Sequence, residues 1–290
     1  MEAITNILKR RNKMGKERLK SISLYILTLL FVVIAVGPFI WSLSTSLKTM
    51  GEIYATPPTL FPRTPIIGNY LDVFETMNFG RIFLNSVIVT SSTIVITIVL
   101  SLLGGYGFSR FRFPMRGLLL MLILIPRIIP SVTRVIPLYQ LFSKIGILDT
   151  YISLIAPYVA DATPIGIWIL IGFFDGIPKE LEEAAMVDGC TRFQALVRVI
   201  IPLTLPGVVT VALFAFIRAW NEFVLAFTFI GSEDMMTLPV AHYRVFELFG
   251  VRHWGAINAY TMLAVLPIMI FFLFFEKRMV KGMTAGSVKG

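Results

Sequence analysis

The sequence has almost none of the side chains that disulfides and most metal sites need. Its 290 residues include one cysteine, Cys190, and two histidines, His242 and His253. A single cysteine excludes an intrachain disulfide and a cysteine-based metal cluster, so we interpret Cys190 as a small filler. Two histidines are too few for a metal site, and we expect both in solvated loop positions. The sequence therefore predicts no metal site and no bound cofactor on this chain.

Familiar catalytic and nucleotide-binding patterns are also missing. No GxxxxGK[ST] sequence occurs, because the Gly15-Lys16 pair is followed by Glu17. The chain is therefore not expected to bind ATP phosphates itself. No Ser/His/Asp arrangement indicates a hydrolase, and no paired aspartates in apolar sequence indicate an intramembrane protease. We predict no catalytic residue, and hence a protein that is not an enzyme.

Charge is scarce as well. Charged residues make up 15% of the chain and apolar residues 56%, with a mean hydropathy of +0.81. Soluble domains are typically about 25% charged and about 45–50% apolar. The apolar residues form blocks long enough to cross about 30 Å of hydrocarbon as helices, in which backbone polar groups are satisfied internally. We predict an all-α, multi-pass protein of the cell membrane that contacts lipid and not nucleic acid.

Six apolar blocks are predicted to span the membrane. They cover residues 22–47, 82–108, 115–138, 151–174, 204–230 and 256–275. Basic residues precede the first block, but it is long and has no clear small-residue cleavage site, so we expect a retained helix and not a removed signal peptide. Pro126, Pro130 and Pro137 loosen the third block, either as a hinge or for packing.

Lysine and arginine are unevenly shared between alternate connections. The two ends of the chain, together with the second and fourth connections, hold 17 of them, whereas the other three connections hold 5. By the positive-inside rule, both termini and the fourth connection lie in the cytoplasm. The outer connections are then 48–81, 139–150 and 231–255. The first of these contains four prolines and is predicted to be an irregular cover with a short helix near Asn69–Met77.

These boundaries divide the chain into five parts. They are a basic cytoplasmic N-terminus (1–21), a first transmembrane helix (22–47), an extracytoplasmic segment (48–81), a five-helix region (82–276) that includes the cytoplasmic loop 176–207, and a cytoplasmic tail (277–290).

The fourth connection is a charged, helix-forming segment between two apolar blocks. Pro178 is a helix-start signal, and the acid-rich stretch Lys179–Asp188 suits the positive end of a helix dipole. Gly189 provides a stop that tolerates positive φ. A second helix from Thr191 to about Ile200 is amphipathic; the residues on its apolar face are Phe193, Leu196, Val197 and Ile200. The segment is either a docking element or a reinforced loop that packs only on its own helices.

The spacing within this segment resembles a known family. Glu183, Ala184 and Ala185 are followed by Asp188-Gly189, and then by an aliphatic pattern that ends at Pro202. This looks like the EAA loop of permease subunits of ABC importers. Val199 and Ile201 stand where that family usually has Ile and Leu, a mild departure. The resemblance implies that Glu183, Ala184, Ala185, Asp188, Gly189 and Pro202 form a coupling helix that sits in a cleft of an ATPase subunit.

Other stretches resemble the carbohydrate-uptake permeases of the MalG type. They are GGYGFSRFRF (104–113), IPLYQLFSKIGILDTY (136–151), WNEF (220–223), TLPV (237–240) and the tail GMTAGSVKG (282–290). The resemblance implies the type I, MetI-like importer fold with six helices. It also implies that connection 231–255 meets a binding protein and that the tail extends toward the ATPase dimer.

The resemblance further implies a function and a set of partners. The chain would be one permease of a binding-protein-dependent importer of di- or oligosaccharides, such as maltose or trehalose. Its partners would be a second, MalF-like permease, an ATPase dimer that carries ATP and Mg²⁺, and an extracytoplasmic sugar-binding protein. The alternatives are a permease for another substrate such as glycerol phosphate, an ion-coupled secondary transporter, and a membrane assembly factor.

The fifth block carries polar residues whose role stays open. Trp220, Asn221 and Glu222 either line a sugar path or lock helices together, within the chain or to a partner permease. Arg218 and Glu222 are four residues apart and are expected to pair, since ionisable groups in membrane helices usually have a partner. In the third block, Arg127 and Arg134 are placed at the outward mouth.

Overall fold

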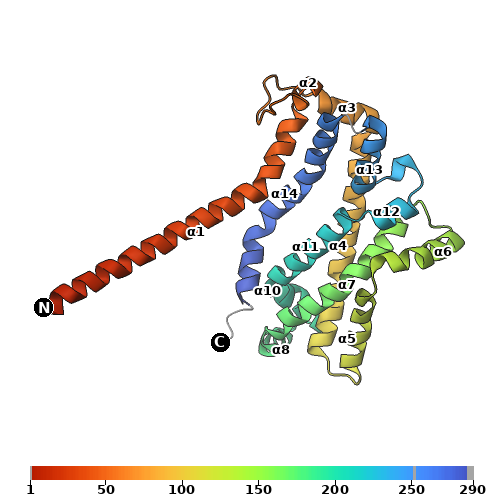
Figure 1. The fold of residues 1–290 in the computed structure, drawn as a ribbon. Coiled ribbons are helices and arrows are strands. Elements are labelled where there is room, and N and C mark those ends of the chain that lie inside the picture. The colour runs from red at the N-terminus through yellow and green to blue at the C-terminus, as the bar shows by residue number, and fades with distance from the viewer. Residues whose placement is uncertain (1, 251–252, 286–290) are drawn as a thin grey trace. The chain divides into compact units, whose positions relative to one another are not determined.

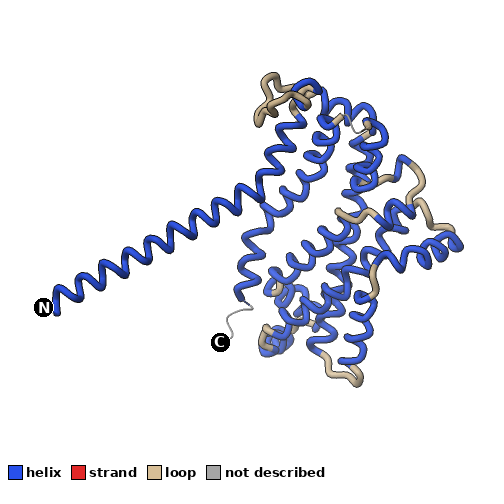
Figure 2. The backbone as a smooth tube through the Cα atoms, viewed as in Figure 1, coloured by secondary structure: helices blue, strands red, loops and turns tan. Residues whose placement is uncertain are grey.

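A computed structural model describes residues 2–250 and 253–285 of the chain (Figure 1). Throughout these ranges the backbone forms helices and loops and no strand (Figure 2). The helices are α1 Glu2–Ser46, α2 Met50–Ile53, α3 Gly68–Met77, α4 Phe79–Arg110, α5 Arg116–Leu124, η1 Ile125–Ile128, η2 Ser131–Arg134, α6 Val135–Ile145, α7 Tyr151–Asp175, α8 Lys179–Val187, α9 Arg192–Ala195, η3 Leu196–Ile200, α10 Ile201–Leu203, α11 Leu205–Trp220, α12 Val224–Phe229, η4 Glu233–Met235, α13 Leu238–Phe249 and α14 Trp254–Ala285.

The chain forms two compact units. The smaller unit comprises Met1–Asp72 and Val251–Met262, and the larger comprises Val73–Gly250 and Leu263–Gly290. In the smaller unit, Asn69 near the start of α3 donates hydrogen bonds to the carbonyls of Ser46 (2.8 Å) and Lys48 (3.0 Å). These bonds satisfy carbonyls at and just after the C-terminal end of α1, which have no partner within the helix. The short helix predicted near Asn69–Met77 is confirmed as α3.

Among the described residues, four helices are long and apolar enough to cross a membrane. They are Lys20–Ser46, Phe79–Arg110, Tyr151–Asp175 and Trp254–Phe275. Two further helix pairs meet the same criterion but are bent, by 94° between Arg116–Ile128 and Ser131–Ile145, and by 79° between Arg192–Leu203 and Leu205–Trp220. By length and composition, the described part of the chain therefore holds four spans, or up to six if each bent pair counts as one. The six predicted blocks correspond to these segments.

The third block is not one continuous helix, and its prolines indicate this. Helix α5 tightens into the 3₁₀ turn η1 at Pro126, and Ile129 then adopts an extended backbone (φ −76°, ψ 123°). Proline disfavours the helical conformation in the residue before it, and Pro130 follows Ile129 directly. The block therefore turns at this point and resumes as η2 and α6.

The prediction of a single span over residues 204–230 is wrong in one respect. Helix α11 ends at Trp220, and the chain is helical again only from Val224. The Glu222 carboxylate accepts hydrogen bonds from the backbone N–H groups of Leu225 (2.9 Å) and Ala226 (3.1 Å). A carboxylate that caps N–H groups in this way favours the start of a new helix over continuation of the old one.

Three long helices, α4, α7 and α11, lie against one another and form the core of the larger unit (Figures 1 and 2). Glycines permit their close approach: a Cβ added at Gly166 would lie 2.1 Å from the Ser101 side chain, and one at Gly207 would lie 2.6 Å from the Phe173 ring. Small residues at helix contacts are typical of membrane proteins, where packing drives association. At one end of these helices a buried hydrophobic cluster joins them to η3; its members are Tyr106, Leu170, Phe174, Leu196, Ile200 and Val211.

Candidate functional site

The charged segment after α7 folds into two short helices, α8 and α9, as its sequence predicts. Pro178 precedes α8, and Glu180 and Glu182 lie in the first turn. At the other end, the N–H of Gly189 bonds to the carbonyl of Met186 (3.1 Å) and that of Cys190 to the carbonyl of Ala185 (3.0 Å). This pair of bonds is a Schellman motif, which needs a residue with positive φ. Gly189 has φ +92°, so the predicted role of this glycine is confirmed.

A capping box fixes the start of the second helix. The Thr191 hydroxyl accepts a bond from the backbone N–H of Gln194 (3.2 Å), and the Gln194 side chain accepts one from the N–H of Thr191 (2.8 Å). These reciprocal bonds satisfy two donors at the helix start. The helix continues from α9 through the π-helical turn η3 into α10. The knuckle, defined here as Pro178–Leu203, thus has ends set by local backbone chemistry.

The apolar face predicted for this second helix is divided between core and surface. Leu196 and Ile200 are buried in the cluster with α4 and α7. The other two residues of the apolar face, Phe193 and Val197, are 66% and 44% exposed. The apolar arc is wider than the surface of this chain that it contacts. Half of that face is therefore left for something other than this chain's own core.

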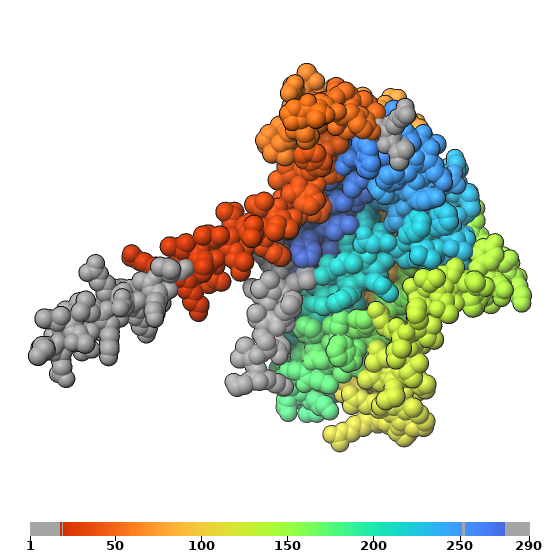
Figure 3. All heavy atoms as spheres, viewed as in Figure 1, coloured from red at the N-terminus to blue at the C-terminus, as the bar shows by residue number. Residues whose placement is uncertain are grey.

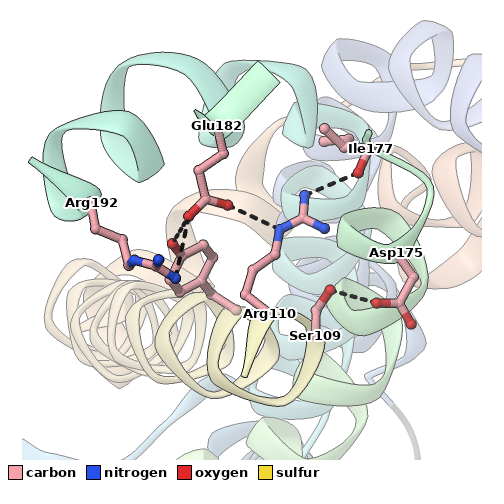
Figure 4. Close-up of polar contacts among 7 residues, drawn as sticks. Ser109, Arg110, Asp175, Ile177, Glu182 and Arg192 are labelled. Carbon is pink, nitrogen blue, oxygen red and sulfur yellow. Dashed lines mark hydrogen bonds and ion pairs between the residues drawn. The ribbon is translucent and has the colours of Figure 1, made fainter. Parts of the chain in front are cut away.

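A buried carboxylate attaches the knuckle to α4. Glu182 is 4% exposed, and its side chain accepts a hydrogen bond from the Tyr106 hydroxyl. It lies 3.1 Å from Nε of Arg110 and 3.9 Å from a guanidinium nitrogen of Arg192 (Figure 4). Arg192 also lies over the Phe111 ring, 5.2 Å from its centre. Tyr106 and Arg110 belong to the last turns of α4, so one side chain of α8 holds three groups from outside that helix.

Two further bonds connect α4 with the chain leading into α8. The Ser109 hydroxyl donates a hydrogen bond to the Asp175 carboxylate (2.5 Å). The Arg110 guanidinium donates to the carbonyl of Ile177 (3.1 Å), just before α8 begins (Figure 4). The end of α4, the end of α7 and the start of α8 are therefore held as one polar assembly. Sequence reasoning missed Glu182 and Arg110; the available signal was spacing, because Glu180 and Glu183 are three residues apart and share a helix face, whereas Glu182 lies on another.

The residues predicted to contact an ATPase lie mainly on the outer side of the knuckle. Four of these residues are exposed: Glu183, Ala184, Asp188 and Gly189. Ala185 is buried, with only 9% of its surface exposed. Pro202, in α10, is also exposed. In the space-filling view the knuckle forms part of the outer surface of the larger unit (Figure 3). The structure thus brings Glu183, Ala184 and Asp188 to one short surface and places Ala185 beneath it.

Apolar side chains share this surface with the acidic ones. Val187 is 87% exposed and Leu181 is 45% exposed. With Phe193 and Val197, they bring the exposed large apolar side chains named here on the knuckle to four. Exposed apolar side chains beside acidic ones suit contact with another molecule.

The polar residues at the end of α11 do not form the expected ion pair. Glu222 lies beyond the helix end, so the four-residue helical spacing from Arg218 is lost. Its carboxylate instead accepts the Tyr158 hydroxyl (2.6 Å) in addition to the two N–H groups of α12. Within the described residues no Arg218–Glu222 ion pair forms, and that prediction is wrong.

Trp220 and Asn221 diverge in the structure. The Trp220 ring is buried, stacks on Phe216 and donates its indole N–H to the carbonyl of Ala264 (3.2 Å). Asn221 is exposed. Within the described chain its side-chain amide donates a hydrogen bond to the carbonyl of Ile217 (2.9 Å). Trp220 and Glu222 are engaged in packing and capping within the chain, which favours the helix-lock interpretation for these two.

The histidines differ from each other in setting. His242 lies in α13, is partly buried and meets the Phe246 ring edge-on; burial lowers its pKa below the ordinary value. The expected solvated loop position is therefore wrong for His242, while His253 is exposed. No group of three or more His, Cys, Asp or Glu side chains in the described part of the chain has the geometry of a metal site. The C-terminal residues 286–290, part of the tail 282–290, and residues 251–252 lie outside the described residues.

Comparisons with known proteins decide the family. Residues 98–283 match the family described as the binding-protein-dependent transport system inner membrane component. The chain belongs to this family. The permease is 37% identical to the sulfoquinovosyl glycerol transport permease SmoH of Agrobacterium fabrum over 87% of this chain and 88% of the relative. It is 34% identical to the trehalose/maltose transport permease MalG of Thermococcus litoralis over 96% of this chain and 100% of the relative.

Another relative and a solved structure agree. The trehalose transport permease SugB of Mycobacterium tuberculosis is 36% identical over 91% of this chain and 96% of its own length. A chain of a bacterial ABC transporter for the acidic polysaccharide alginate superposes with a TM-score of 0.80 at 21% identity, covering 90% of this chain and 97% of that one. The predicted all-α importer-permease fold is confirmed. The protein is a multi-pass membrane permease subunit of a transporter and not an enzyme.

Proposed function

We propose that this permease forms one half of the membrane pathway of an ATP-driven, binding-protein-dependent importer of oligosaccharides or related glycosides. Relatives across nearly the whole chain are named for trehalose or maltose, diacetylchitobiose and sulfoquinovosyl glycerol transport. All of these are glycosides, which supports a substrate of that class. The partners of this permease are a second permease, an ATPase dimer that binds ATP and Mg²⁺, and an extracytoplasmic binding protein that contacts residues 231–255.

The observation that carries the coupling role is the division of the knuckle into a buried anchor and an exposed face. Glu182 is held by α4, whereas Glu183 and Val187 face outward. The excess of Lys and Arg in alternate connections supports a cytoplasmic location for this face. A surface that combines acidic groups with apolar side chains suits a cleft with a basic rim and an apolar floor.

In this proposal ATP binding closes the ATPase dimer and displaces the knuckle. The Glu182–Arg110 contact passes that displacement to α4, and the Ser109–Asp175 bond passes it to α7. The two helices then move with the knuckle, and the pathway alternates between inward and outward access. Two carboxylates within the bundle favour this ATP-driven mechanism over ion coupling. Asp161 is paired with Arg134, and Glu222 accepts hydrogen bonds from backbone N–H groups.

The test is reconstitution of the complete transporter with its cognate ATPase, second permease and binding protein. Glu183→Ala, alone and combined with Gly189→Pro, is compared with Glu75→Ala, which removes an exposed carboxylate from α3. We expect uptake to fall by about tenfold or more in the Glu183 variants, the effect of losing about 1.4 kcal/mol or more of interface contact. Glu75→Ala should transport normally.

Co-purification in mild detergent gives the second readout. The wild-type chain should bring down an ATPase and a second permease. Normal uptake by the Glu183 and Gly189 double variant would refute the coupling role. Absence of both partners from the wild-type preparation would refute the importer assignment.

A further inference from the structure

Three arginines and one aspartate of the larger unit lie outside the knuckle; Arg127, Arg134 and Asp161 are partly buried and Arg218 is exposed. Arg127 lies in η1, Arg134 in η2, Asp161 in α7 and Arg218 in the last turn of α11. Each side chain comes from a helix that is part of a membrane-crossing segment or bent pair. Ionisable groups at such positions are costly and generally serve a function.

The aspartate neutralises only one of the three arginines. Arg134 contacts both carboxylate oxygens of Asp161, at 2.5 and 3.2 Å. Arg127 bonds instead to the backbone carbonyl of Asp161 (2.6 Å), a group without net charge. In addition, Nε of Arg134 is buried and has no hydrogen-bond partner among the described residues.

Arg218 adds a further positive charge. It lies in the last turn of α11, where it is exposed, and its charge acts unfavourably on that of Arg127. Within the described chain, neither of these two guanidinium groups forms an ion pair with a carboxylate. The cluster therefore carries an excess of positive charge that nothing in this part of the chain compensates.

The position of the cluster matches that of a transport site. Asp161 is near the middle of α7 (Tyr151–Asp175), about 15 Å from its first residue at 1.5 Å per residue, or roughly half of a 30 Å hydrocarbon layer. Arg127 and Arg134 flank the 94° break after η1, and Arg218 comes just before the break that follows Trp220. Transporters commonly form midplane substrate sites where membrane helices are broken.

We propose that the cluster of Arg127, Arg134, Asp161 and Arg218 binds an anionic group of the transported glycoside, a sulfonate, carboxylate or phosphate. This rests on the proposed importer function and narrows its substrate class. Guanidinium groups offer paired N–H donors that match the oxygens of such anions. Asp161 holds Arg134 in place and, through its carbonyl, orients Arg127. A neutral sugar would supply no counter-ion for the excess charge.

The experiment uses the complete reconstituted transporter and pairs of radiolabelled probes that differ only in charge. The anionic probes are sulfoquinovosyl glycerol, a glucuronic acid glycoside of glycerol and a glucose 6-phosphate glycoside of glycerol; glucosyl glycerol is their neutral counterpart. We expect uptake of at least one anionic probe and about tenfold less or no uptake of the neutral one, since charge-assisted hydrogen bonds are lost. Equal uptake of glucosyl glycerol, or uptake of no probe, overturns the proposal.

Variants locate the effect. Arg218→Gln should lower uptake of the anionic probe by about tenfold, and Arg218→Lys should retain part of it. Lys144→Gln, which removes an exposed positive charge at the end of α6, should behave as wild type. If Arg218→Gln instead reduces recovery of the second permease on purification, Arg218 pairs with that subunit and the proposal fails.

The two proposals fail in distinguishable ways. Recovery of the ATPase and second permease with transport of neutral glycosides would leave the importer function in place and remove only the anion site. Loss of those partners from the wild-type preparation would remove the importer function itself.

Discussion

The guanidinium of Arg110, at the C-terminal end of α4, lies 3.1 Å from the carboxylate of Glu182 in α8, with side chains only 3% and 5% exposed. A buried ion pair of this kind adds little net stability, because desolvation of both charges offsets their attraction. Its consequence is geometric. Neither charge is stable there without the other, so α8 is held at one place against α4.

The first prediction concerns removal of one partner. Glu182→Ala leaves Arg110 buried and removes the acceptor of the Tyr106 hydroxyl. We expect destabilisation of about 3–5 kcal/mol, the usual result of breaking a buried pair. The measurement is thermal or denaturant unfolding of the detergent-solubilised permease. Glu180→Ala, an exposed change in the same helix, should alter stability by no more than about 0.5 kcal/mol; similar effects for both variants would contradict the anchor.

The second prediction tests the turn between the knuckle helices. Gly189 has φ +92° with no atom within 4 Å of an added Cβ, so backbone strain alone opposes a side chain. Gly189→Ala should cost about 1–2 kcal/mol. Gly172→Ala is the control, because that glycine is exposed within α7 and an added Cβ meets nothing; alanine there should be neutral or slightly stabilising. Equal unfolding midpoints for the two variants would show that the Schellman turn is not strained by alanine.

The third prediction concerns the contact between α4 and α7. An added Cβ at Gly166 would approach Ser101 Oγ to 2.1 Å and Ser101 Cβ to 2.9 Å. The helices must separate to accept it, at about 1–3 kcal/mol. Gly107→Ala, in α4 with open space around the added atom, should have little effect. The comparison is made by unfolding in detergent, and an unaffected Gly166→Ala would mean that the helices are packed less closely than described.

The fourth prediction is that the stability of the contact between two loops of the larger unit depends on pH. The Asp149 carboxylate accepts hydrogen bonds from the N–H groups of Ser232 and Gly231 and from the Ser232 hydroxyl, at 3.0 to 3.1 Å. The bond from the Ser232 backbone is the main cause that holds the pKa of Asp149 below its ordinary value. The stabilisation is therefore present above the unfolded pKa of about 4 and is lost as pH falls through the lower folded value.

Asp149→Asn isolates this contribution, because asparagine keeps an acceptor oxygen but does not titrate. Protease susceptibility of the 231–250 region should rise in the wild type as pH is lowered below about 4, the range in which a depressed carboxyl protonates. The variant should show a smaller change. Parallel pH profiles for both proteins would contradict the role given to Asp149.

Several features were readable from local sequence because their causes are local. Gly189 ends α8 because positive φ is costly for other residues, and Thr191 with Gln194 starts the next helix through its own capping box. The break after η1 follows from the restriction that Pro130 places on Ile129. The break after Trp220 was missed because it depends on Glu222 using its carboxylate for α12, and a single glutamate gives no signal of which donors it will meet.

By itself the sequence determined that this protein is helical, apolar and membrane-crossing, and that two short helices, Lys179–Asp188 and Thr191 to about Ile200, form a charged segment between apolar blocks. Composition and spacing are sufficient for this because hydrocarbon thickness and backbone capping act over a few residues. Only the tertiary structure decided that Glu182 faces inward while Glu183 faces outward, and that Arg127 and Arg134 both contact Asp161. Burial and charge compensation depend on neighbours far apart in the chain, and no local pattern specifies them.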